Sequence, residues 1–230
     1  MENSKDNRRS ISLQHPEIKG TFDKIFNMVL AESDMGAILI STSVLDQYLR
    51  KLFENVMPTS CSKTMRKSLL SYPGPLSTLS AKADVAYSMR LISSDIHRSI
   101  HTLRDIRNKA AHQPEQFKLD AYKERLKEMY DIADGFAELV HVMSKIYIFD
   151  GFSSRLLEED QKRVPEERLF EGKQPSDIYQ ELQNYPDSLE VLQGKAARME
   201  LGLCVAWLCA FIVHSWELFQ EKYEGDKLIR

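Results

Sequence analysis

The chain has 230 residues, of which 43% are hydrophobic and 28% are charged, values close to the average for a folded globular domain. This composition excludes wholesale disorder, a collagen-like repeat and a disulfide-rich scaffold, and the length suits one domain. A formal net charge of −3 provides no overall cationic field that would attract nucleic acid. The cysteines are three in number and show no pattern, which favours a reducing, cytoplasmic compartment over secretion.

Charge is unevenly distributed along the chain. Residues 61–112 hold nine lysines and arginines against three aspartates, whereas residues 151–200 hold seven basic residues against eleven acidic ones. The first stretch is a candidate for binding an anion. The alternative is that both stretches are ordinary solvated helix faces, because charges that are close in sequence need not cluster in space.

The first twenty residues contain no apolar run long enough for a signal peptide, and we expect a flexible arm over residues 1–20. From Phe22 onward, apolar residues recur at the spacing of amphipathic helices. The remaining residues, 21–230, are interpreted as a single domain. The pattern predicts helices over about Ala37–Met57, over Lys63–Leu70, from Leu79, from Ser94 to Pro114, and over Leu119–Phe149.

No segment alternates apolar and polar residues as a half-buried strand would, so the sequence predicts an all-α fold. Short connections between helices favour an antiparallel helical bundle. Residues 151–195 are polar and acidic, with scattered proline and glycine, and they predict a long excursion that contains one short helix near Ser176.

The excursion leads into an apolar segment at the C-terminal end. Leu201–Trp216 contains no lysine, arginine, aspartate or glutamate. At 1.5 Å per residue this run spans about 24 Å, which is short of the roughly 30 Å hydrocarbon core of a bilayer. We therefore expect a buried core helix over residues 196–222 and no membrane contact.

Most motifs that carry chemistry are absent: there is no glycine-rich phosphate loop, no Cys/His cluster with zinc spacing and no nucleophile elbow. His97 and His101 are four residues apart on a predicted helix, a spacing at which both could bind one metal ion. The sequence suggests no third ligand nearby. We therefore expect neither a metal nor a cofactor.

One constellation does suggest chemistry, namely Arg107 and His112 near the end of a predicted helix. An arginine presents a fixed fork of donors to a phosphate, and a histidine near neutrality can act as a general acid or base. The two lie about 140° apart around the helix axis, so they would converge on a ligand only with a second copy of the chain. The alternative is that Arg107 is oriented by an acid, Glu32 or Asp34, and that His112 caps the helix end.

Several short stretches together resemble a known family. They are Glu32-Ser33-Asp34-Met35-Gly36-Ala37, Leu45-Asp46, Gly74-Pro75-Leu76-Ser77-Thr78-Leu79-Ser80-Ala81-Lys82, Ala86-Tyr87, Leu91-Ile92 and Arg107-Asn108-Lys109-Ala110-Ala111-His112. The last stretch resembles the R-x4-H signature of the HEPN superfamily, which includes metal-independent endoribonucleases and many non-catalytic relatives. More specifically, the chain resembles the MltR family, named for the mannitol operon repressor. It departs from that family at Met35, where a basic residue is common, and in the length of residues 151–195.

The resemblance implies an all-helical, homodimeric intracellular protein assigned to transcriptional regulation. Because no helix pair leads into a basic recognition helix, we expect such a protein to act through an RNA or protein partner and not through a DNA-reading motif. The competing hypothesis is a metal-independent endoribonuclease. Its catalytic residues would be Arg107, Asn108 and His112 from two subunits, with Arg104 and Lys109 binding the RNA at the rim.

Overall fold

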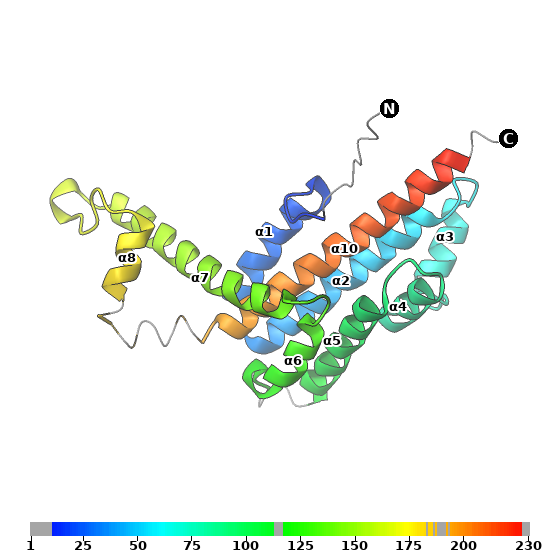
Figure 1. The fold of residues 1–230 in the computed structure, drawn as a ribbon, viewed down its shortest axis with the longest axis horizontal. Helices are drawn as coiled ribbons and strands as arrows, with labels where there is room; N and C mark the ends of the chain where they lie inside the picture. The colour runs from blue at the N-terminus through cyan, green and yellow to red at the C-terminus, as the bar shows by residue number, and fades with distance from the viewer. Residues whose placement is uncertain are drawn as a thin grey trace, which may run out of the picture.

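The computed structural model describes residues 11–112, 117–182, 184–185, 187, 192 and 194–226, and in this part of the chain it contains helices and no strand. This confirms the all-α prediction (Figure 1). The α-helices are α1 (Pro16–Ala31), α2 (Asp34–Val56), α3 (Lys63–Leu70), α4 (Leu79–Ser88), α5 (Ser94–His112), α6 (Lys123–Tyr130), α7 (Phe136–Gln161), α8 (Pro175–Leu182) and α10 (Ala196–Asp226). Two 3₁₀ turns, η2 (Leu119–Tyr122) and η3 (Pro165–Glu167), complete the described elements.

Helices α2 and α10 lie side by side at the centre of the bundle (Figure 1). Arg198 near the start of α10 contacts Asp34 at the start of α2, and Gln220 donates a hydrogen bond to Asn55 near the end of α2. The two helices therefore run in the same direction. In contrast, α1 is joined to α2 by two residues and runs antiparallel to it. The predicted antiparallel packing thus applies to neighbours joined by short turns, while the central pair is parallel.

Helix α10 is the core helix that its composition predicts. It packs against α1, α2 and α7, and Leu201, Cys204, Leu208, Cys209 and Ile212 are fully buried. Burial raises the pKa of both thiols, so the two cysteines are packing residues. Within the described residues, α10 is also the one helix long and apolar enough to cross a membrane, and 67% of its most apolar window is buried inside the protein.

The predicted helix over Leu119–Phe149 is wrong in two respects. The helix is interrupted between Tyr130 and Phe136. In this interruption Gly135 has a φ of 72°, a conformation that suits glycine because it has no Cβ. After the break, α7 continues past Phe149 to Gln161. An Asp-Gly pair marks a turn, but apolar residues at helical spacing on both sides of it hid this signal.

The predicted arm over residues 1–20 ends earlier than expected. Helix α1 begins at Pro16, since proline suits the first turn of a helix. Leu13 and Ile18 are buried and belong to the core. Residues 1–10 lie outside the described part of the chain, as does Pro114, which was expected to end α5.

The polar excursion is shorter than residues 151–195, because α7 continues to Gln161 and occupies the first quarter of that stretch. At the end of α7, Asp160 is 5% exposed. Its two carboxylate oxygens accept the backbone N–H groups of Leu169 and Phe170, each at 2.9 Å, and so fold the following loop back on the helix. Helix α8 then forms where a short helix was predicted, and it packs on α7 through Ile178.

Two stretches that carry the family resemblance meet in an ion pair between a buried lysine and a partly exposed aspartate. Lys82 on α4 is 1% exposed, and its Nζ lies 2.8 Å from Oδ1 of Asp46 on α2 and 3.3 Å from the carbonyl oxygen of Leu76. The turn before α4 is tight, because a Cβ on Gly74 would lie 2.0 Å from the carbonyl oxygen of Ser68. These motif residues therefore hold α4 on α2.

We expect Lys82→Met to lower the free energy of unfolding by roughly 1–3 kcal/mol, because it removes a charge-assisted hydrogen bond, while Asp46, whose side chain is 37% exposed, stays in contact with water. Chemical denaturation measures this loss. Lys67→Met, at an exposed lysine on α3, is the matched control and should change stability by less than about 0.5 kcal/mol. Equal effects of the two substitutions would contradict the structural role of Lys82.

Acid should release the loop that follows α7. The backbone N–H of Leu169, followed by that of Phe170, lowers the pKa of Asp160 below the ordinary carboxyl value. A carboxyl group with a lowered folded-state pKa contributes stability above its unfolded pKa and loses that contribution as the pH falls through the folded value. We therefore expect the hydrogen-exchange protection of the Leu169 and Phe170 amides to fall below about pH 4.

The same amides should lose protection at neutral pH in Asp160→Ala. Glu159→Ala, which removes the neighbouring exposed carboxylate, is the control and should leave their protection unchanged. If the Asp160 variant keeps wild-type protection, the carboxylate does not hold the loop.

Candidate functional site

Helix α5 carries the predicted functional residues, and its sequence dictates which of them reach the surface. Its apolar positions recur at helical spacing and pack against α2, α4 and α6. The residues buried on this side include Ile96, Ile100, Leu103, Ile106 and Ala110. Most polar positions therefore form the opposite, solvent-facing side of the helix, whereas Arg107 lies in line with Ile100 and Leu103 and is exposed near the helix end.

Arg107, Asn108 and His112 lie on the last turns of α5. Arg107 and His112 are exposed and Asn108 is half-buried. Nη1 of Arg107 donates a hydrogen bond to Oδ1 of Asn108 at 3.2 Å, which holds the guanidinium along the helix. His112 lies in the final turn of the helix. The structure thus places all three at or near solvent, with Arg107 and His112 on different sides of the helix.

The two predicted anion-binding residues, Arg104 and Lys109, differ in whether their side chains are free to bind an anion. Arg104 is half-buried, and its guanidinium contacts Nδ1 of His101 at 3.2 Å and the carboxylate of Asp105 at 3.7 Å. Lys109 is exposed, and its ammonium lies 5.7 Å from the centre of the Tyr122 ring. Lys109 is therefore free to meet an anion beside an aromatic face, whereas Arg104 already has partners within the protein.

The predicted orienting acids do not face Arg107. Asp34 accepts the backbone N–H of Leu119 at 2.9 Å, and its other oxygen lies 3.4 Å from Nε of Arg198. The carbonyl oxygen of Glu32 accepts a hydrogen bond from the same guanidinium. The expectation for these acids is corrected accordingly: they fasten the start of α2 to α10 and to the segment after α5.

The predicted basic stretch, residues 61–112, is not one cationic surface. Lys82 is neutralised in the core, Arg66 donates to three backbone carbonyls, and Arg98 pairs with an aspartate at 3.0 Å. For Arg107 and Lys109, no carboxylate of the described residues lies within 4.0 Å. On α5, the positive charge without an acidic partner is therefore concentrated at the C-terminal end.

A second polar cluster lies toward the N-terminal end of α5. His97 and His101 each place Nε2 at 2.8 Å from Oδ1 of Asp84 on α4. The sequence predicted no metal site because no third ligand was found near His97 and His101. In the structure, the carboxylate of Asp84 lies close enough to both histidines to be that third ligand. Sequence analysis missed it because this carboxylate lies on a different helix, and its distance in the chain follows no ligand spacing.

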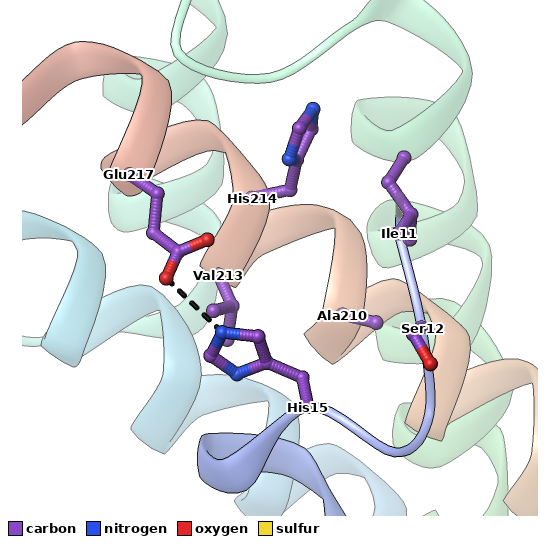
Figure 2. A pocket seen from close by; sticks show the side chains of 7 residues that line it. All are labelled: Ile11, Ser12, His15, Ala210, Val213, His214 and Glu217. Atoms are coloured by element: carbon purple, nitrogen blue, oxygen red, sulfur yellow. Dashed lines mark hydrogen bonds and ion pairs between the residues drawn. The ribbon is translucent and has the colours of Figure 1, made fainter. Parts of the chain in front are cut away.

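A surface hollow of about 480 Å³ lies between the N-terminal segment and α10. Figure 2 shows His15 and Glu217 facing each other across it, with Nε2 of His15 at 3.0 Å from a carboxylate oxygen of Glu217. The other ring nitrogen of His15 accepts the backbone N–H of Glu17 at 3.2 Å. Both ring nitrogens of His15 are therefore engaged, Ala210 and Val213 add apolar wall, and the imidazole of His214 also lines the hollow.

The described geometry therefore offers one exposed cationic end of α5 and one His/Asp cluster on the same helix. The resemblance to MltR and HEPN proteins stays a hypothesis that depends on the residues that carry it. Comparison of the chain with protein-family models, with curated proteins and with solved structures finds no match in any of the three.

Proposed function

We propose that this protein is a cytoplasmic, homodimeric regulatory module of the MltR type that binds RNA at the C-terminal end of α5. One observation carries the proposal: Arg107 and Lys109 are exposed there, and no carboxylate in the described part of the chain neutralises them. An arginine binds a phosphate with two parallel hydrogen bonds, and a lysine adds a point charge. His112, in the last turn of the same helix, adds an exposed imidazole that can donate a hydrogen bond to a phosphate.

Single-stranded RNA suits this surface better than duplex DNA. A helix that reads the major groove uses its N-terminal residues, but at the start of α5 the side chains of His97 and Arg98 are bound to Asp84 and Asp95. At the other end, Lys109 lies beside the ring of Tyr122. Unpaired bases stack on aromatic rings while basic side chains hold their phosphates.

Self-association belongs to the proposal. Leu139, Val142 and Ile146 recur on one face of α7, and all three are exposed. A contiguous apolar stripe of this kind is typical of an interaction surface. A symmetric dimer would present two copies of the α5 end to one RNA and so increase the number of phosphate contacts.

A metal-independent endoribonuclease is the second candidate, and one observation favours it. Arg107 and His112 are both exposed within five residues of each other at a helix end. Within one chain they lie about 140° apart, so a second copy would have to bring His112 to the phosphate that Arg107 binds. The 2′-hydroxyl would then attack its own phosphodiester while His112 moves a proton and Arg107 stabilises the developing charge.

An RNA-binding assay tests the proposal. Labelled single-stranded RNA is incubated in EDTA with the wild-type chain, Arg107→Ala, Lys109→Ala and Arg98→Ala. We expect Arg107→Ala and Lys109→Ala each to weaken binding several-fold. Each should also reduce the slope of log K against log salt concentration by about one, because one phosphate contact is lost. Arg98 is the matched control, because it lies on the same helix about 13 Å along the axis from Arg107 and is already paired with Asp95. Its variant should bind like the wild type.

The same samples separate the two candidates. If the RNA stays intact and bound, the protein is a binding module. If the RNA is cleaved in EDTA, and the cleavage is lost in both Arg107→Ala and His112→Ala, the protein is a nuclease. If binding falls equally in Arg98→Ala, or if no RNA is bound at all, the α5 surface is not an RNA site.

A further inference from the structure

The cluster of Asp84, His97 and His101 joins two helices at the surface. Nε2 of each histidine lies 2.8 Å from the same oxygen, Oδ1 of Asp84. The three groups offer ligand atoms that all lie within 4.8 Å of one another, and the two imidazole rings are 4.5 Å apart, centre to centre. The histidines keep about a quarter of their side-chain surface exposed, and Asp84 keeps about half. The cluster is therefore open to solvent on one side.

The turn between α4 and α5 fixes the position of these groups. The backbone N–H groups of Arg90 and Leu91 donate to the carbonyl oxygens of Tyr87 and Ala86, both at 2.9 Å, and Arg90 adopts a φ of 59°. The hydroxyl of Ser93 then caps the start of α5. A short and fully hydrogen-bonded turn of this kind places the two helices in a fixed register, so the third ligand does not depend on a flexible loop.

Neighbouring side chains orient the ligands further. The ring of Tyr87 stacks on His97 with centres 4.7 Å apart and an angle of 25° between planes. Hydrogen bonds from His97 and then from His101 lower the pKa of Asp84, so its carboxylate is ionised at neutral pH. The cluster therefore combines one negative oxygen donor with two imidazoles one helical turn apart.

We propose that Asp84, His97 and His101 bind a divalent transition-metal ion of the zinc type. Two imidazole nitrogens and one carboxylate form a donor set that Zn²⁺ takes in sites that keep a further position open for water. The exposed side of the cluster provides that position. Ligand atoms lie about 2.0–2.2 Å from a zinc ion and so about 3.4 Å from one another in a tetrahedral site, which requires the two N–O distances of 2.8 Å to widen by about 0.6 Å. The imidazole donors favour Zn²⁺, Co²⁺ and Ni²⁺ over Mg²⁺ or Ca²⁺.

Arg104 gives the site a distinctive property. A guanidinium can only donate hydrogen bonds, so Nδ1 of His101, 3.2 Å from Arg104, acts as an acceptor, and Nε2 carries the proton that is shared with Asp84. An ion at Nε2 displaces that proton, and the neutral ring then carries its proton on Nδ1. Arg104 must turn away for this, toward Asp105 at 3.7 Å. The arginine therefore opposes metal binding.

Metal titration of the untagged, EDTA-treated full chain tests the site. Zn²⁺ uptake is followed by calorimetry, and Co²⁺ uptake by its visible absorption. We expect one equivalent per chain, a loss of affinity of about tenfold or more in His97→Ala and in His101→Ala, and weaker binding at acid pH because protons compete for the ligand nitrogens. Arg104→Gln should bind more tightly than the wild type, because the glutamine oxygen can accept the Nδ1 proton.

His141→Ala is the matched control, since His141 is another surface histidine with one carboxylate partner, Glu200 at 2.6 Å. It should bind Zn²⁺ like the wild type. Circular dichroism of each variant shows whether the helices are retained. The proposal is overturned if the wild-type chain takes up no Zn²⁺, if His97→Ala and His101→Ala bind as the wild type does, or if His141→Ala loses as much affinity as they do. The outcome is independent of whether α5 binds RNA.

Discussion

The burial of one apolar helix, α10, is the constraint on which the rest of the molecule depends. The sixteen residues Leu201–Trp216 contain no charged side chain, so their transfer from water is strongly favourable only if other helices cover them on several sides. α1, α2 and α7 provide this cover. Polar contacts at the two ends, from Arg198 to Asp34 and from Gln220 to Asn55, fix the register of α10 on α2. Apolar burial thus stabilises the pair, and a few directional contacts specify its alignment.

Helix α5 shows how one amphipathic sequence produces two distinct surfaces. Its apolar stripe is used to bind the helix to the bundle, which leaves a long polar face toward solvent. The N-terminal part of α5 lies next to α4, where Asp84 contacts His97 and His101, whereas the C-terminal part extends beyond α4 and keeps Arg107 and Lys109 without acidic partners among the described residues. Helix α5 carries a His/Asp cluster where α4 lies beside it and a cationic surface where α4 no longer does, so the length of α4 determines the difference.

Sequence patterns predicted the parts of the structure that depend on local chemistry. The spacing of apolar residues was sufficient to predict the helical class and α3, and the lack of charged residues was sufficient to predict that α10 is buried. The break at Gly135 was missed because apolar periodicity on both sides concealed a turn. In the candidate site, the exposure of His112 follows from the pattern of α5, but the exposure of Arg107, which continues the apolar stripe of Ile100 and Leu103, the partners of Asp34 and the proximity of Asp84 to His97 could not be predicted. Those contacts join residues on different helices, and their geometry is set by tertiary packing.

The parallel pairing of α2 with α10 has a consequence for how the chain acquires its structure. The contact between Asn55 and Gln220 spans 165 positions of sequence, and contacts of such long range are slow to form because a large loop must close first. During synthesis, α2 leaves the ribosome long before its main packing partner exists. Its apolar side must stay exposed or be covered temporarily by α1 and α5, so the nascent protein is vulnerable to aggregation until α10 has been translated.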